Sequence, residues 1–190
     1  MDASVFDKIR LSAGSIERSV QWYRSQISKL GTLNVPRTIR EGNTVNAVIP
    51  GEMYLYIYNP KMHEQLPYYD IFPLVIPFRR KIGGFIGINI HYLPYAIRMN
   101  LLKQLSFFAT DARNDQDTRI KLSWRLIESS IRFLPAKACV KHYLLEHVKS
   151  RFLKIPYPDW VIASQLPIEG FMKEQKNVIW RENRNKYLNV

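Results

Sequence analysis

The middle of the chain alternates short apolar runs with turns of proline and glycine. Three runs, Met53–Tyr58, Ile71–Phe78 and Phe85–Tyr92, are rich in β-branched and aromatic residues, and the first and third alternate with a period of two. This pattern predicts three short strands. Because proline cannot donate a hydrogen bond to a sheet ladder, Pro73 and Pro77 predict that the second strand follows a sheet edge or a kinked path.

Two turns connect these strands. The first is the polar segment Asn59–Pro67, and the second consists of Arg79, Arg80 and Lys81 followed by the pair Gly83–Gly84. Two hairpins of this size predict a small, strongly bent antiparallel sheet, in which the glycines permit tight bends.

Outside this region apolar residues recur at spacings of three and four, which is typical of helices that pack one face on a core. The predicted helices span residues 15–30, 94–108, 117–133, 136–152 and 173–187. Asp159 is expected to cap a short helix that ends near Gln165, and Pro167 to begin another.

These elements predict an α+β fold, with a small bent antiparallel sheet over about residues 50–92 that is flanked and wrapped by helices. Hydrophobic residues make up 46% of the 190 residues, which is enough for a real core. We expect residues 1–14 to form a flexible N-terminus and residues 15–190 a single domain. Residues 32–48 show no period and are expected to form a linker or an extended arm.

The positive charge of the chain is large and evenly distributed. The net charge is +12, and residues 1–50, 51–107, 108–150 and 151–190 each contain three more basic than acidic residues. The positive field therefore belongs to the folded body rather than to a tail, which favours nucleic acid or an acidic protein surface as a partner. The alternative is that the positive charge keeps the protein soluble and binds no anionic partner.

The candidate DNA-binding residues lie in the basic turn or share one face of a predicted helix. They are Arg79, Arg80, Lys81, Lys121, Arg125, Arg132, Lys137, Lys141, Lys173, Lys176 and Arg184. Trp180 and Tyr187 lie on the same face of the last helix, where flat rings beside cations can stack on an exposed base. Solvated helix faces and an exposed hairpin tip are the alternatives.

Catalytic patterns are weak. No nucleophile elbow or phosphate-binding glycine loop is present, and we expect neither a cofactor nor enzymatic activity. Asp159 and Glu174, the latter followed at two residues by Lys176, superficially match the acids and lysine of a Mg²⁺ nuclease, but neither acid ends a convincing strand. Cys139, His142 and Glu146 would share a helical face, yet no second cluster completes a metal site.

The same reading excludes a disulfide and a membrane span. Cys139 is the only cysteine, so no internal disulfide can form. The longest run without charge, Ile82–Ile97, has 16 residues and contains glycines, a histidine and a proline, which is too short and too polar to cross a bilayer. The acidic start of the chain predicts no secretory signal.

Several short runs along the chain form a recognisable series: Trp22–Tyr23, Leu30–Gly31, Pro50–Tyr54, Tyr58–Lys61, Leu66–Leu74, Gly83–Phe85, Asn89–Leu93, Cys139–Leu144 and Ala163–Glu169. In this order they resemble the DNA end protector (head completion) family of T4-like tailed bacteriophages, whose members are small virion proteins. The most distinctive are Leu66–Leu74 and Gly83–Phe85, and the resemblance covers about residues 20–185.

The resemblance implies a virion protein that joins the filled head near the portal, caps the end of the packaged genome and hinders host exonucleases. It implies portal, neck or tail subunits and double-stranded DNA as partners, with assembly in the host cytoplasm. The resemblance supplies no set of functional residues, so the candidate DNA-binding residues are inferred from the basic clusters alone. The alternatives are a neck, tail or baseplate protein without DNA contact and, more remotely, the Mg²⁺ nuclease.

Overall fold

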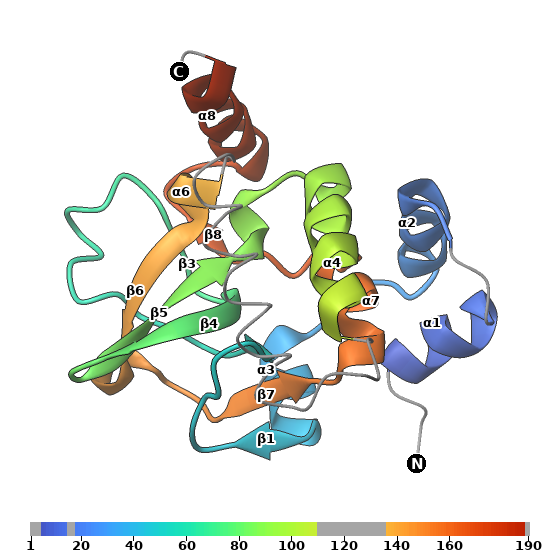
Figure 1. Ribbon diagram of the computed structural model, residues 1–190, viewed down its shortest axis with the longest axis horizontal. Coiled ribbons are helices and arrows are strands. Elements are labelled where there is room, and N and C mark those ends of the chain that lie inside the picture. The colour runs from blue at the N-terminus through green and yellow to red at the C-terminus, as the bar shows by residue number, and fades with distance from the viewer. Residues whose placement is uncertain (1–4, 15–17, 110–135, 189–190) are drawn as a thin grey trace.

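A computed structural model of the protein describes residues 5–14, 18–109 and 136–188 (Figure 1). The helices are α1 (Val5–Ala13), α2 (Val20–Ser28), α3 (Val35–Glu41), α4 (Tyr95–Ala109), α6 (Ala136–Cys139), α7 (Trp160–Gln165) and α8 (Lys176–Leu188). Three short 3-10 turns accompany them, namely η1 (Ile90–Tyr92), η2 (Leu145–His147) and η3 (Tyr157–Asp159).

The strands form two antiparallel sheets, so the α+β prediction is confirmed. They are β1 (Thr44–Val45), β2 (Met53–Leu55), β3 (Tyr69–Asp70), β4 (Leu74–Lys81), β5 (Gly84–Asn89), β6 (Val140–Leu144), β7 (Phe152–Ile155) and β8 (Phe171–Met172). The larger sheet has the order β1-β7-β2-β4-β5-β6, and β3 pairs with β8 in the smaller one. The larger sheet therefore extends beyond the predicted region and recruits strands from both sides of it.

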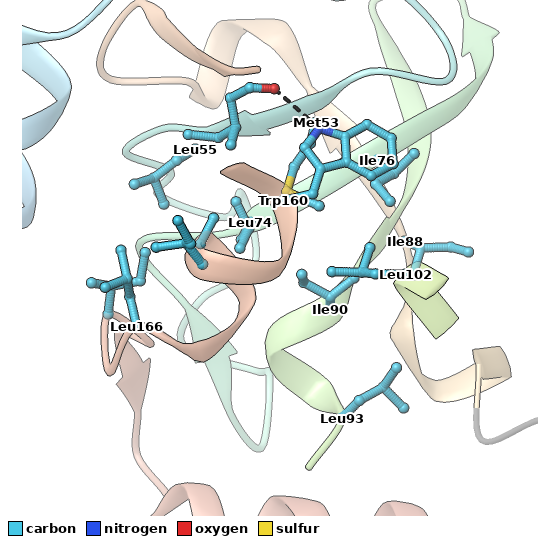
Figure 2. Packing of buried hydrophobic residues seen from close by; sticks show 14 of the residues in the cluster. Met53, Leu55, Leu74, Ile76, Ile88, Ile90, Leu93, Leu102, Trp160 and Leu166 are labelled. Carbon is cyan, nitrogen blue, oxygen red and sulfur yellow. Dashed lines mark hydrogen bonds between the residues drawn. The ribbon is translucent and has the colours of Figure 1, made fainter. Parts of the chain in front are cut away.

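One face of the larger sheet is aliphatic and is covered by helices. Figure 2 shows Met53, Ile76 and Ile88 from the sheet packed with Trp160 from α7, whose indole donates a hydrogen bond to the carbonyl oxygen of Ile155 at 3.1 Å. Helix α7 contacts α1, α2 and α4, so these helices form one layer on this face, to the right in Figure 1. Burial of this apolar surface is the main stabilising term of the fold.

The opposite face of the sheet is aromatic. Tyr54, Tyr56, Tyr58, Phe85, Tyr143 and Phe152 form a second buried cluster with Val75. Most of their rings meet edge to face, as Tyr56 and Phe152 do at 4.9 Å between centroids, and Phe85 and Tyr143 are stacked. Both are favourable arrangements of aromatic quadrupoles. A bridge between Tyr58 and Val148 draws the segments after β2 and β6 together over these rings, although the sheet stays open.

The second predicted strand lies inside the sheet rather than at its edge. Pro77 is in β4, between β2 and β5, and the pairing register shifts between Pro77 and Arg79. This β-bulge accommodates the proline, because a bulge interrupts the ladder where the donor is missing. Gly87 lies opposite Pro77, and a Cβ there would collide with the side chain of Val75 and the backbone of Pro77.

Two segments near the N-terminus are more ordered than predicted. Residues 1–14 were expected to be flexible, but α1 occupies Val5–Ala13 and buries Ile9 in the core. Residues 32–48 contain α3, which Asn34 caps by accepting a hydrogen bond from the backbone N–H of Arg37 at 3.0 Å, and the edge strand β1. Their weak periodicity arises because each element is short: α1 and α3 bury two side chains each, and both residues of β1 are half-buried.

The predicted helix over residues 136–152 is wrong. It ends at Cys139, and β6 follows from Val140 to Leu144 and pairs with β5. Over so short a stretch, the apolar residues of this segment fit both the period of a helix and the period of a strand. The open edge of β5 decides between them, because it offers a complete ladder of hydrogen bonds to β-branched and aromatic residues.

The helix predicted over residues 117–133 lies outside the described residues, and no helix begins at Pro167, where an extended segment leads into β8. The helices expected over residues 15–30, 94–108 and 173–187 correspond to α2, α4 and α8, although α2 and α8 begin later than predicted.

The aromatic face predicts opposite effects for two neighbouring tyrosines. The hydroxyl of Tyr56 is buried without a hydrogen-bond partner among the described residues, whereas the hydroxyl of Tyr54 donates to Glu52 at 2.6 Å and accepts from the N–H of Ile49 at 3.0 Å. Tyr54→Phe should lower the free energy of unfolding by about 2 kcal/mol, and Tyr56→Phe should leave it unchanged or raise it. Urea denaturation of both variants measures this, and an equal loss in both would contradict it.

Candidate nucleic-acid interface

The densest group of exposed cations lies at the tip of the β4–β5 hairpin. Lys81 pairs with Gly84, so Ile82 and Gly83 alone form the turn. Gly83 has a φ of 71°, a left-handed conformation that favours glycine. Arg79, Arg80 and Lys81 are all exposed, and the hairpin projects to the left in Figure 1, away from α1 and α2.

The register places these cations on both faces of the hairpin. Arg80 pairs with Phe85, whose side chain lies on the aromatic face, and Arg79 pairs with Ile86 on the opposite face. Successive side chains of a strand point to opposite faces, so Lys81 lies on the same face as Arg79. The tip can therefore present positive charge in two directions at once.

A cleft opens along β6 on the aromatic side of the sheet. Its volume is about 180 Å³ and its lining is largely tyrosine, with Tyr58, Pro60, Leu66, Tyr68, Tyr69, Asp70, Tyr92, Lys141, His142 and Tyr143 around it. The ammonium group of Lys141 lies 4.3 Å from the ring centroid of Tyr92. Lys141 was predicted on a helix beside Lys137, and the strand geometry of β6 instead turns it toward these rings. Such a cleft can accept a ligand that carries a planar ring and an anionic group.

The floor of this cleft is held by a buried carboxylate. Asp70 accepts hydrogen bonds from the backbone N–H groups of Phe72 and Gly170 at 3.0 and 2.9 Å, and from Asn89 Nδ2 at 3.0 Å. Its Oδ2 also lies 2.8 Å from Nδ1 of His91. These hydrogen bonds tie the small β3–β8 sheet to the end of β5.

Two of the three predicted cations near α8 have partners within the protein. Nζ of Lys173 donates to the carbonyl oxygens of Glu64 and Leu66 at 2.7 and 3.0 Å. Nζ of Lys176 lies 3.6 Å from Glu169 and 5.6 Å from the ring centroid of Trp180, so the predicted proximity of Lys176 and Trp180 is confirmed. Arg184 is exposed on α8. DNA contact by Lys173, Lys176 and Arg184 therefore stays a prediction.

Beneath α8 lies the most deeply buried charge of the described chain. Arg98 of α4 is fully buried and donates to the carbonyl oxygens of Leu93, Ser164 and His91 at 2.6, 2.9 and 3.0 Å. Its Nη2 also forms an ion pair with Glu169 at 2.7 Å. Burial alone raises the pKa of Glu169, but the charges of Arg98 and Lys176 outweigh it and lower the pKa to about 2.

The remaining predicted residues fall outside this description. Lys121, Arg125 and Arg132 lie outside the described residues, as does the side chain of Lys137 in α6. The DNA-binding set thus stays a prediction, with Arg79, Arg80 and Lys81 as its one compact group in the described chain.

The residues that the weaker alternatives require have other roles. Asp159 precedes α7 but makes no capping hydrogen bond, because its carboxylate accepts three from Arg10, at 2.9, 2.6 and 2.6 Å. Cys139 is buried and His142 is exposed on a strand, so they do not share the predicted helical face. In residues 5–14, 18–109 and 136–188 no group of three metal-ligating side chains occurs, and no described helix has the length and hydropathy of a membrane span.

Sequence reasoning missed both the buried Arg98 and the aromatic cleft. A single arginine within the apolar stripe Ile97–Leu105 was the available signal for the first. The cleft had no such signal, because its lining comes from segments some 80 residues apart that the β5–β6 pairing and the Tyr58–Val148 bridge bring together.

Comparison with known proteins matches the chain to one family. A family model described as phage T4 terminal DNA protecting protein matches residues 3–185, almost the whole chain. No curated protein and no solved structure matches it.

The low pKa of Glu169 predicts a pH-dependent contribution to stability. A depressed carboxylate pKa stabilises the folded state above the unfolded value of about 4.5, and this contribution is lost as the pH falls toward about 2. Glu169→Gln should therefore cost about 3 kcal/mol at pH 7, and the difference from wild type should shrink below about pH 4.5. Denaturant titrations from pH 7 to pH 3 test this, with the exposed Glu64→Gln as control. A difference that does not change with pH would contradict it.

Proposed function

The chain belongs to the family of phage T4 terminal DNA protecting proteins, and on that premise we propose that it binds the ends of linear double-stranded DNA without sequence preference. It acts as a head-completion protein of the virion near the portal, where it shields the genome terminus from exonucleases. Its role is structural rather than enzymatic.

The observation that carries this proposal is the projecting hairpin with cations on both faces. Arg80 lies on one face, and Arg79 and Lys81 on the other. A duplex end presents two phosphate backbones that flank one terminal base pair. A narrow tip with positive charge in two directions can approach both backbones, and lysine or arginine contacts to phosphate are the main source of non-specific affinity.

Sequence neutrality follows from the type of contact. Phosphate contacts position a protein on DNA and carry no sequence information directly. A protein that protects a terminus gains nothing from reading bases, because the end must be held whatever its sequence. The net charge of +12 adds long-range attraction toward DNA.

A second surface supports contact with virion subunits. Met62, Leu66 and Met172 are exposed, and the hydrogen bonds from Lys173 to Glu64 and Leu66 hold the β8 segment beside the 60–68 loop. Flexible methionine side chains suit adaptable protein contacts. We assign this rim to the portal, neck or tail subunits, with assembly in the host cytoplasm and residence in the virion.

The alternatives have less support. A neck, tail or baseplate protein without DNA contact agrees less well with the family, whose description names terminal DNA. A Mg²⁺ nuclease that uses Asp159 and Glu174 would require the metal to displace the Arg10 guanidinium from Asp159.

The test compares linear duplex with a covalently closed circle of the same sequence over a salt series, together with protection of the linear form from exonuclease. Preferential binding to linear DNA with protection supports the proposal. Equal binding to both forms would reduce the protein to a general DNA-binding protein, and no binding near physiological salt would favour the purely structural alternative.

The hairpin cations should determine the salt dependence. Arg80→Gln combined with Lys81→Gln should weaken DNA binding and make the slope of log K against log salt less steep by about 0.9 for each phosphate that the hairpin no longer neutralises. Lys8→Gln combined with Lys29→Gln is the matched control, since it removes the same charge from exposed sites beside α1 and α2. Equal effects of the two pairs would show that overall charge, rather than the hairpin, determines affinity.

A further inference from the structure

The hairpin ends in an apolar tip. Ile82 is completely exposed, with a relative accessibility of 102%, and Leu145 beside it is 49% exposed. The N–H of Leu145 donates to the carbonyl oxygen of Gly83 at 2.9 Å, so the start of η2 is fastened to the turn. Two large apolar side chains therefore lie at the point where β4, β5 and β6 end together.

The turn itself does not require an isoleucine. The special backbone conformation is at Gly83, whereas Ile82 has an ordinary negative φ that polar residues adopt readily. Single exposed apolar residues are common on protein surfaces. Here, however, the exposed residue directly follows three cations, and a second exposed apolar residue, Leu145, is hydrogen-bonded to the same turn. This pattern suits a ligand that is both anionic and apolar.

A duplex end has that combination of properties. Within a duplex every base pair is stacked on both sides, whereas the terminal pair exposes one apolar face to water between two lines of phosphates. An aliphatic side chain can cover that face by hydrophobic contact, and it avoids the cost of a few kcal/mol per step that intercalation inside the duplex requires.

We propose that Ile82, supported by Leu145, packs on the exposed face of the terminal base pair while the cations of the hairpin contact the phosphates of the two strands. The inference rests on the proposed function and adds to it the source of end selectivity. Phosphate contacts attract the protein to any part of a duplex, and the apolar tip gains its contact only at a terminus. Every base pair has an apolar face, so this contact does not depend on sequence.

The neighbouring acid does not cover the apolar tip. Glu146 follows Leu145 in η2, and its carboxylate contacts Nε2 of His147 at 3.3 Å. Ile82 remains completely exposed beside it, and the hairpin cations exceed this one acid in number. The local charge therefore still favours an approaching phosphate backbone.

The experiment uses the full chain with Ile82→Ser, Ile82→Trp and the control Leu11→Ser. Leu11 is 81% exposed on α1, so its substitution removes a comparable exposed side chain far from the hairpin. Binding is measured to linear duplex and to a closed circle, and duplexes that carry 2-aminopurine at the terminal or at a central position report local contact.

Wild type should change the emission of the terminal probe and not that of the central one. Ile82→Ser should lower the preference for linear over circular DNA by about fivefold to tenfold, while affinity for the circle and its salt slope stay unchanged. Ile82→Trp should keep or increase the preference, because a flat ring stacks well on a base pair. Leu11→Ser should behave as wild type.

The possible outcomes distinguish failure of this inference from failure of the proposed function on which it rests. An unchanged linear-over-circle preference in Ile82→Ser would overturn the inference and leave end protection intact, as would be the case if the tip docks on a virion subunit. A wild-type protein that binds neither DNA form would overturn both. Equal losses in Ile82→Ser and Leu11→Ser would also overturn the role of the tip.

Discussion

The buried guanidinium of Arg98 is the interaction on which the arrangement of the C-terminal half depends. It donates to carbonyl oxygens of η1, of the segment before α4 and of α7, and it pairs with Glu169 just before β8. Trp180 of α8 donates to the same carbonyl oxygen of His91 that Arg98 contacts, at 2.8 Å. Removal of Glu169 would leave the buried charge of Arg98 without its ion-pair partner, which is far more costly than the loss of a surface ion pair. Arg98 thus holds α4, α7 and α8 in one register against the end of β5.

That rigid body supports the β4–β5 hairpin. β4 and β5 are anchored by the aliphatic core on one face and by the aromatic cluster on the other, so the strands remain paired up to the tip. The bulge after Pro77 separates the buried part of β4 from its exposed basic part. A tip on such a base loses little conformational entropy on binding, which favours a contact made only at the end of a DNA molecule.

End recognition without base readout needs an attraction that is general and a contact that only termini allow. We propose that the net charge of +12 supplies the first and the apolar tip the second. Membership in the terminal DNA protecting family accords with this division, because protection requires occupancy of the end and not cleavage or sequence selection. In the same proposal, the methionine-containing rim beside β8 is a separate surface for subunits of the virion.

The sequence by itself determined the α+β class, the β4–β5 hairpin with its basic turn, helices α2, α4 and α8, and the family, because these depend on local periodicity, turn residues and distinctive runs. Tertiary structure decided what local pattern leaves ambiguous. Val140–Leu144 became a strand because β5 had an open edge, and Pro77 entered an interior strand because a bulge and Gly87 made room. Lys173 donates to the 60–68 loop and Lys176 to the hydroxyl of Tyr95, and both partners are distant in sequence. The partners of Arg98 lie up to 71 residues away along the chain, from Arg98 to Glu169, and such pairings carry no local signal that a single sequence reveals.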